Sequence, residues 1–440
     1  MTKSAPAIKP HHPPAKHALR LVRRRWITTV VAAVLGTAGT AVIFDVATQP
    51  GEAPAYGQDD LLRDTEAIEA LGVVGIQARV TTDSGPDLVA TSGFAEDGTD
   101  RPVDGDGFFR IASTGKAMVA TVVLQLVEEG VLSLDDTVDQ WLPGLVAANS
   151  NDGSSITVHH LLQHTSGLQD GLPGYADHED YLEHRYDVYT PDQIVDMAME
   201  HRADSAPGTE WRYSNTGYVL LDMIIEQATG RPWHQEVAER ILEPLGMDHT
   251  YLPGDDPTLR SPHAKSYEVY PNGDRLDVTE VIISDPGGYI STTANVNRFL
   301  RALLGGELLP QARLAEMRET VPVSQDMQAF WPGGAYGLGL VERPLSCGGS
   351  YWSHEGGESG YINLNGSTDD GSRTVTVSMN TALANSPDSM LRQEQTASDL
   401  IDHALCGAVD DERDQRSVTS DAYSIPAGIT APVSRAAGRS

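Results

Sequence analysis

A serine and a lysine lie one helical turn apart in Phe108–Lys116, whose sequence is FFRIASTGK. Apolar residues then recur with helical spacing over Met118–Val127, which predicts a buried helix that ends at Gly130. Ser113 lies at or just before the first turn of this helix, and Lys116 lies on the same face, so their side chains can touch. A serine hydroxyl becomes a nucleophile when a base takes its proton, and a neutral lysine amine is such a base. The pair is therefore a candidate for acyl transfer.

A structural interpretation of the same residues is simpler, because serine is a favoured N-cap and S-x-x-K arises by chance. Lysine usage favours chemistry instead. After residue 55 the chain contains two lysines, Lys116 and Lys265, whereas arginine is used freely. Arginine keeps its proton in proteins, but a buried or crowded lysine can lose it.

The charge of the chain excludes some classes of partner. The 440 residues carry a formal net charge of -31. Residues 1–55 contain seven Lys and Arg and two acids, which leaves 24 basic and 60 acidic residues, or -36, for the remainder. Such a surface repels nucleic acid and anionic membranes, so we expect no nucleic-acid partner and contact with a membrane only through the N-terminal segment.

The N-terminal segment has the pattern of an export signal. Residues 1–25 are basic, and Trp26–Val46 is mostly apolar with no charge before Asp45. This is either a signal peptide, with Ala53–Ala55 as a cleavage site, or a single membrane anchor. In both cases the rest of the chain is expected outside the cell, secreted or held on the outer face of the membrane. We expect a leader over 1–55, one hydrolase domain over 56–406 and a polar, disordered tail over 407–440.

Strand patterns occur at both ends of the expected domain, and helical patterns fill its middle. Val73–Thr82 and Leu88–Phe94 read as a hairpin, and further strands are expected at Gly337–Glu342, Ser350–His354, Gly360–Leu364 and Thr374–Asn380. The predicted fold class is α+β, an α/β sandwich: one antiparallel sheet from the N- and C-terminal strands packs on helices, with a helical middle lobe. The cleft between them is the natural site.

Two further segments carry groups that an acyl-transfer site needs. In Tyr213–Asn215, a phenol can pass a proton and the amide of Asn215 can hold a substrate carbonyl. In His354–Gly357, the glycines at 356 and 357 let a substrate backbone come close. Each segment also has a structural interpretation: a buried tyrosine with a structural asparagine, and a plain strand-to-turn junction.

In this order, the three segments resemble the signature of the serine β-lactamase and penicillin-binding superfamily, which is S-x-x-K, then Y-x-N, then K-T-G or a variant. The chain is most similar to the D-alanyl-D-alanine carboxypeptidase and class C β-lactamase branch, where histidine can begin the third motif. The resemblance covers roughly Leu61–Leu405 and implies a β-lactamase/transpeptidase-like fold. It is supported by Gly130–Thr137, Leu161–Leu168 and Gly287–Leu304.

The resemblance also implies roles for individual residues. Ser113 attacks a carbonyl and becomes acylated, while Lys116 and Tyr213 share the proton transfers. Asn215, His354, Gly356 and Gly357 bind substrate, with His354 across the cleft, where it binds or protonates. The N–H groups of Ser113 and Gly357 form the oxyanion hole.

One departure from the family pattern bears on the substrate. Threonine or serine commonly follows the first residue of the third motif, and a hydroxyl residue follows its glycine, but here these positions are Glu355 and Gly357. A carboxylate beside the cleft would repel a substrate's terminal carboxylate. Esterase, D-amino-acid amidase or relaxed peptidase activity therefore fits as well as strict carboxypeptidase activity.

The sequence thus predicts an exported serine hydrolase that acts through an acyl-enzyme, D-alanyl-D-alanine carboxypeptidase-like on cell-wall peptides. An esterase, D-amino-acid amidase or β-lactamase of the same fold is the first alternative, and a non-catalytic cell-wall or penicillin-binding sensor is the second. We expect a monomer without a cofactor, and β-lactams as covalent ligands.

Histidine and cysteine positions were also examined for a metal site and for a disulfide. His159, His160 and His164 lack a carboxylate in a helical i,i+4 frame, so no metal site is expected. Cys347 and Cys406 are the two cysteines, and outside the cell such a pair can form a disulfide. The sequence leaves that pairing open.

Overall fold

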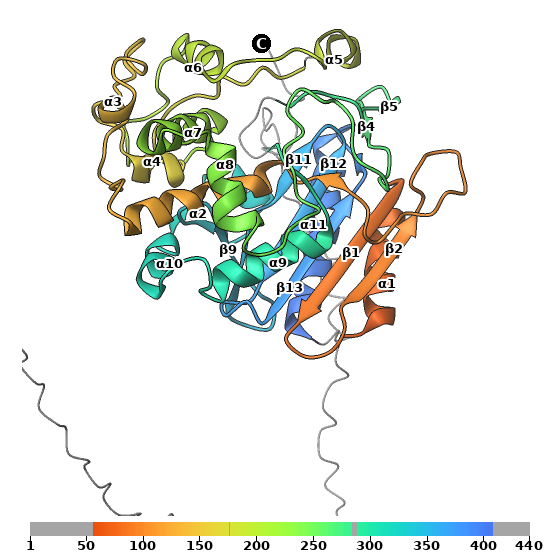
Figure 1. Ribbon diagram of the computed structural model, residues 1–440. Helices are drawn as coiled ribbons and strands as arrows, with labels where there is room; N and C mark the ends of the chain where they lie inside the picture. Colours follow the sequence, from red (N-terminus) through yellow and green to blue (C-terminus); the bar gives the residue numbers. More distant parts are fainter. Residues whose placement is uncertain (1–55, 176, 284–287, 408–440) are drawn as a thin grey trace, which may run out of the picture. The chain divides into compact units, whose positions relative to one another are not determined.

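A nine-stranded antiparallel sheet forms the centre of the domain (Figure 1). The computed structural model describes residues 56–175, 177–283 and 288–407. The sheet has the order β2 (Leu88–Gly93), β1 (Gly75–Thr82), β13 (Arg373–Met379), β12 (Tyr361–Ser367), β10 (Ser350–Ser353), β9 (Val341–Pro344), β8 (Ala335–Tyr336) and β7 (Val321–Pro322), and β11 (Gly356–Glu358) also pairs with β12. The predicted hairpin is β1 and β2. Because β1 pairs along its whole length with β13, the N- and C-terminal strands share one sheet, as predicted.

Helices cover both faces of this sheet. In β1, Ile76, Ala78 and Val80 point to one face and pack with α1 (Gln58–Glu69) and α11 (Pro387–Cys406) in a common apolar cluster. The alternate residue Arg79 points to the other face, where its guanidinium donates to Thr293 of α9 (Thr293–Leu304). The period-two alternation of β1 therefore separates the two helical layers. The predicted α+β fold class is confirmed.

The middle of the chain forms a helical lobe around a second, larger core. Its central helix is α2 (Gly115–Glu128), which follows the 3-10 turn η1 (Ala112–Thr114) and is buried along most of its length. The other helices of the lobe and its surroundings are α3 (Val138–Trp141), α4 (Val158–Leu162), α5 (His178–His184), α6 (Pro191–Met199), α7 (Asn215–Thr229), α8 (Trp233–Val237), η2 (Ala238–Leu242), α10 (Gln311–Met317) and η3 (Met327–Ala329). Two small sheets complete the domain: β3 (Phe109–Arg110) with β6 (Ile290–Ser291), and β14 (Thr381–Ala382) with β4 (Tyr267–Val269) and β5 (Arg275–Asp277).

The strand predicted over 337–342 is correct only at its end. The strand β8 ends at Tyr336 and β9 begins at Val341, whereas residues 337–340 form no strand and pass over α2 instead. Gly339 has φ +86°, and a Cβ added there would lie 2.4 Å from the Cβ of Ala120. Glycine is needed here because the backbone crosses α2 at contact distance in a left-handed conformation.

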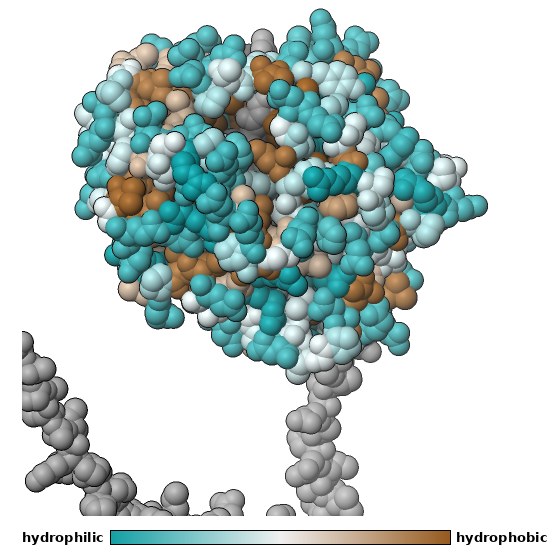
Figure 2. Space-filling view, viewed as in Figure 1, coloured by the Kyte–Doolittle hydropathy of each residue, from teal (hydrophilic) through white to brown (hydrophobic). Residues whose placement is uncertain are grey.

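A disulfide joins Cys347 to Cys406, which resolves the pairing that the sequence left open. The predicted leader and the tail beyond Gly407 lie outside the described residues. Within the described ranges, no helix is both long and apolar enough to span a bilayer. On the face seen in Figure 2, hydrophilic residues predominate and hydrophobic ones form small separate patches.

Candidate active site

Ser113 and Lys116 meet at the start of α2, as their spacing predicted. Ser113 lies in η1, and the Nζ of Lys116 donates a hydrogen bond to Ser113 Oγ over 3.0 Å. Lys116 has no exposed surface. Bulk water therefore does not solvate the amine directly, and the hydroxyl of Ser113 is one of the polar groups that contact it.

The turn that presents Ser113 is held against β11. Ala112 has φ +47°, a left-handed conformation that is uncommon for a residue with a Cβ. A Cβ on Gly356 would lie 2.1 Å from the carbonyl oxygen of Ile111. The glycine of the third motif is thus required for the strand to approach the turn before Ser113. Its predicted contact with substrate stays a prediction.

Tyr213 lies beside the amine of Lys116. The Nζ of Lys116 is 5.5 Å from the centroid of the Tyr213 ring. The ring itself packs on His164, with centroids 4.3 Å apart, and His164 Nδ1 accepts a hydrogen bond from the N–H of Ser214. The His164 ring therefore orients this segment in two ways: it packs on the side chain of Tyr213 and binds the backbone N–H of Ser214. The sequence was used only to argue against a metal site at His164, and it did not predict this contact.

Asn215 is the first residue of α7, which is capped by Ser214. Its Nδ2 donates to Asp170 Oδ2 over 2.6 Å, so the amide nitrogen is engaged within the protein. Its Oδ1 is buried and has no hydrogen-bond partner among the described residues. The amide is therefore positioned by Asp170, and its predicted role in substrate binding stays a prediction.

His354 is fully engaged inside the protein. Its Nδ1 lies 2.9 Å from the carbonyl oxygen of Glu355 and its Nε2 lies 3.0 Å from the hydroxyl of Tyr336. Because a carbonyl oxygen can only accept, Nδ1 carries the proton and Nε2 accepts from Tyr336. Burial, with a smaller effect of Lys116, lowers the pKa of His354 to about 3. The ring is therefore neutral and has no spare proton for a ligand.

A side-chain network ties the strand at His354 to the turn at Ser113. β10 and β11 pair with β12 in one register, and this ladder is interrupted at His354 and Glu355. There the amide of Asn365 accepts from the N–H of His354 over 3.0 Å and donates to its carbonyl over 2.7 Å. Thr114 Oγ1 donates to the same carbonyl over 2.8 Å. The residue after Ser113 thus holds the third motif in place, a role that sequence spacing did not reveal.

The charge of Glu355 is balanced by a neighbouring cation, which the sequence did not predict. The sequence placed an uncompensated negative charge beside the cleft, but Glu355 is 4 % exposed and forms an ion pair with Arg343. Its other oxygen accepts from Trp331 Nε1 over 2.6 Å. The expected repulsion by a free carboxylate is therefore wrong, because a buried cation 12 residues away in the sequence balances it.

These residues surround a narrow space beside the serine. It has a volume of about 10 Å³, which is about the room that one water molecule needs. It is lined by Ser113, Tyr213, Trp331, His354, Glu355, Gly356 and Gly357. Six of these seven residues were singled out from the sequence, five of them as site residues. Trp331 was missed because it belongs to no motif.

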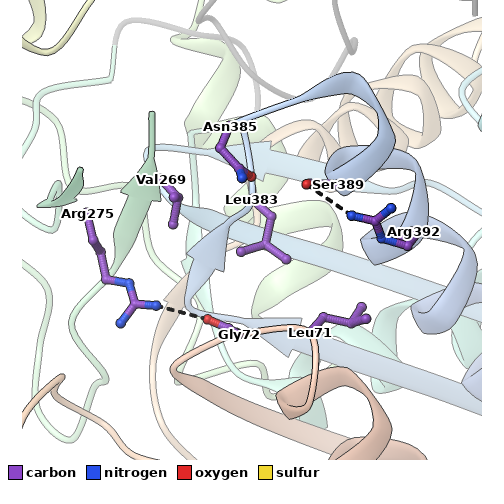
Figure 3. Close-up of a pocket in the computed structure, with 8 residues that line it drawn as sticks. All are labelled: Leu71, Gly72, Val269, Arg275, Leu383, Asn385, Ser389 and Arg392. Atoms are coloured by element: carbon purple, nitrogen blue, oxygen red, sulfur yellow. Dashed lines mark hydrogen bonds between the residues drawn. The ribbon is translucent and has the colours of Figure 1, made fainter. Parts of the chain in front are cut away.

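A second pocket among the described residues lacks a base that could activate its serine. A pocket of about 200 Å³ lies between β4, the end of α1 and the start of α11, with Leu383 and Val269 on its apolar wall (Figure 3). Arg275 and Arg392 border it, but its lining contains no lysine or histidine to activate its one serine, Ser389. Over the described residues, His159, His160 and His164 take part in no cluster of three metal-ligating side chains.

Comparison with known proteins identifies the family. Residues 59–397 match the family model described as Beta-lactamase. The chain belongs to the Beta-lactamase family. It is accordingly a serine hydrolase with the β-lactamase/transpeptidase-like fold, and the resemblance drawn from the three motifs is confirmed.

Individual relatives within the Beta-lactamase family carry different names. The chain is 31% identical over 287 residues to Penicillin-binding protein 4* of Bacillus subtilis, which covers 62% of this chain and 60% of that protein. Among solved structures, a D-stereospecific amidohydrolase from Streptomyces sp. is 35% identical, with a TM-score of 0.70 over 80% of this chain and 100% of the other. A D-amino acid amidase from Ochrobactrum anthropi is 27% identical, with a TM-score of 0.66 over 77% of this chain and 96% of the other.

Proposed function

We propose that the protein is an acyl-enzyme amidohydrolase in which Ser113 is the nucleophile. One observation supports this above all: the hydroxyl of Ser113 lies 3.0 Å from a buried lysine amine at the edge of a cleft. Ser113 Oγ attacks a carbonyl carbon while its proton passes to the Lys116–Tyr213 pair. The same pair returns a proton to the leaving amine or alcohol, and water then releases the acid.

The oxyanion of the tetrahedral intermediate needs two fixed donors. In this proposal they are the N–H groups of Ser113, in the turn before α2, and of Gly357, in β11. Gly356 brings the two segments together because it has no side chain. Removal of one such donor costs roughly 3–4 kcal/mol of transition-state stabilisation in well-studied enzymes.

We propose small amides and esters of D-amino acids as the substrate class. The names of the Streptomyces and Ochrobactrum proteins support this choice, since the chain aligns with nearly their full length. A carboxypeptidase acting on cell-wall peptides is the second candidate, and the similarity to a penicillin-binding protein favours it. The apolar segment 26–46 supports the further proposal that the domain acts outside the cell.

Covalent labelling tests the assignment directly. We expect a fluorophosphonate or a penicillin to add one adduct to the wild-type protein, and peptide mapping after intact-mass measurement to place it on Ser113. Ser113→Ala should abolish the adduct and lower kcat/KM for a D-amino acid amide by at least about 10³-fold. Ser84→Ala, which removes an exposed serine, is the matched control. Full labelling of Ser113→Ala would reject the nucleophile, and labelling without turnover would favour a sensor.

A further inference from the structure

Trp331 forms a fixed wall of the cleft beside Ser113. Its indole is 3 % exposed, and its N–H donates to Glu355 Oε2 over 2.6 Å. The ring also packs edge-on against Trp211, with centroids 6.2 Å apart. A side chain held by both a hydrogen bond to a carboxylate and an aromatic contact has little freedom to move when a ligand enters.

Behind this wall lies a buried charge cluster. Arg343 of β9 pairs with the second oxygen of Glu355 and also donates to Ser398 Oγ over 3.1 Å. Glu394 of α11 lies 3.4 Å from the same guanidinium. Burial, followed by the nearby Glu355, raises the pKa of Glu394 well above its usual range, which favours the protonated form of this carboxyl. The guanidinium of Arg343 is therefore balanced chiefly by Glu355, the nearer of the two carboxyl groups.

The pairing determines which charges face a substrate. None of the seven residues that line the space beside Ser113 is an arginine or a lysine. The guanidinium of Arg343 lies on the other side of Glu355 and is already balanced. A carboxylate that entered this cleft would lose its water and gain no cation, which is costly. A carboxamide or ester of the same shape would lose much less.

We propose that the Glu355–Arg343 pair determines the leaving-group specificity of the enzyme. It fixes Trp331 as an apolar wall and keeps the guanidinium of Arg343 neutralised, so the site accepts uncharged leaving groups and rejects those that end in a carboxylate. Glu355 and Arg343 act in this as positioning residues. The inference rests on the proposed function, because it concerns the same cleft.

The test uses two substrates that differ only in terminal charge: an N-acylated D-alanyl-D-alanine and its C-terminal carboxamide. We expect the wild-type protein to hydrolyse the carboxamide with a kcat/KM at least about tenfold higher. A ratio of one or less would overturn the proposal without any variant. Labelling of Ser113 is measured on the same samples. Absence of labelling would contradict the proposed function. Labelling together with equal kcat/KM values for the two substrates would contradict only this inference.

Variants then assign the selectivity to the pair. Glu355→Gln keeps an acceptor for Trp331 but leaves Arg343 unbalanced, so the preference for the carboxamide should fall at least about tenfold, mainly through a lower KM for the carboxylate substrate. Glu342→Gln is the matched control, since that glutamate lies in β9 beside Arg343 and accepts a hydrogen bond from Ser350. Its ratio should equal that of the wild type.

A second variant keeps the test decisive if the first one does not fold. In Glu355→Gln/Arg343→Met both charges are removed, a replacement that buried ion pairs often tolerate. Its preference for the carboxamide should return toward that of the wild type, because no unbalanced guanidinium remains to attract the carboxylate substrate. If the folded double variant keeps the low preference of Glu355→Gln, the freed guanidinium does not cause the change and the proposal fails.

Discussion

At the scale of single residues, burial decides which groups near the site are charged. It lowers the pKa of His354 to about 3 and that of His164 well below its usual range, so both rings are neutral at pH 7. It has the opposite effect on an acid: burial, followed by the nearby Glu358, raises the pKa of Glu268 to about 7. The residue types were visible in the sequence, but these charge states depend on neighbours that it does not reveal.

Glu268 gives a pH prediction with a definite sign. In the folded protein its carboxyl keeps a proton up to about pH 7, whereas in the unfolded chain it loses the proton above about pH 4.5. The folded state is therefore favoured below pH 4.5, and this stability is lost as the pH rises through 7. Glutamine does not ionise, so Glu268→Gln should exceed the wild type in free energy of unfolding at pH 8, by up to on the order of 3 kcal/mol.

Urea unfolding at two pH values measures this effect. At pH 4.5 the wild type and Glu268→Gln should be nearly equal in stability, and this measurement serves as the internal control. The difference should open between pH 5 and pH 8. An equal difference at both pH values would show that packing of the amide, rather than ionisation of Glu268, explains it.

At the scale of elements, the site depends on an interruption between β10 and β11, at His354 and Glu355. The sequence predicted a strand that ends near His354, and the structure shows the same register continuing into β11 after two residues. Asn365, directly across from His354, supplies the hydrogen bonds at the interruption. Thr114 connects this point to the turn of Ser113. Periodicity cannot predict such a junction, because it is built by side chains more than 200 residues apart in the sequence.

Thr114→Val tests whether this connection positions the nucleophile. Valine keeps the shape of threonine but leaves the carbonyl of His354 with one donor fewer, so we expect a loss of about 1–3 kcal/mol in stability. We also expect kcat to fall at least about tenfold, because Ser113 and β11 are no longer tied together. Denaturant unfolding and steady-state kinetics on a D-amino acid amide measure the two effects.

Thr121→Val is the matched control. This threonine is equally buried in α2, but its hydroxyl donates to the carbonyl of Ala117 within the same helix. It should lose a similar amount of stability and keep its kcat, and Thr114→Ser should recover activity. If both valine variants lower kcat alike, the effect belongs to the stability of α2 and not to the contact with His354.

At the scale of the whole molecule, the sequence was sufficient for the architecture and for most of the site. The hairpin of β1 and β2, the capped helices α6 and α7, and the late strands carry strong local patterns, so the α+β fold could be predicted. Ser113 and Lys116 could be paired because they are one turn apart. Trp331 and the Arg343 partner of Glu355 could not, because each reaches the cleft through tertiary packing alone.

The disulfide provides a prediction at this same scale. It joins Cys347, in the connection from β9 to β10, to Cys406 at the end of α11, across a separation of 59 residues. Closing a loop of that length restricts the unfolded chain by about 4 kcal/mol in the chain-entropy treatment. Removal of the bond should therefore lower the free energy of unfolding by roughly that amount, through the unfolded state and without rebuilding the sheet.

Guanidinium unfolding with and without a reductant measures this contribution. The wild-type midpoint should fall on reduction, and the Cys347→Ser/Cys406→Ser variant should match the reduced wild type and be insensitive to the reductant. Labelling of Ser113 by a fluorophosphonate in the absence of denaturant should persist in all three samples, since neither cysteine lines the cleft. If the double variant instead unfolds at the midpoint of the oxidised wild type, the bond does not stabilise this domain, and the packing of α11 against β12 and β13 holds the helix without it.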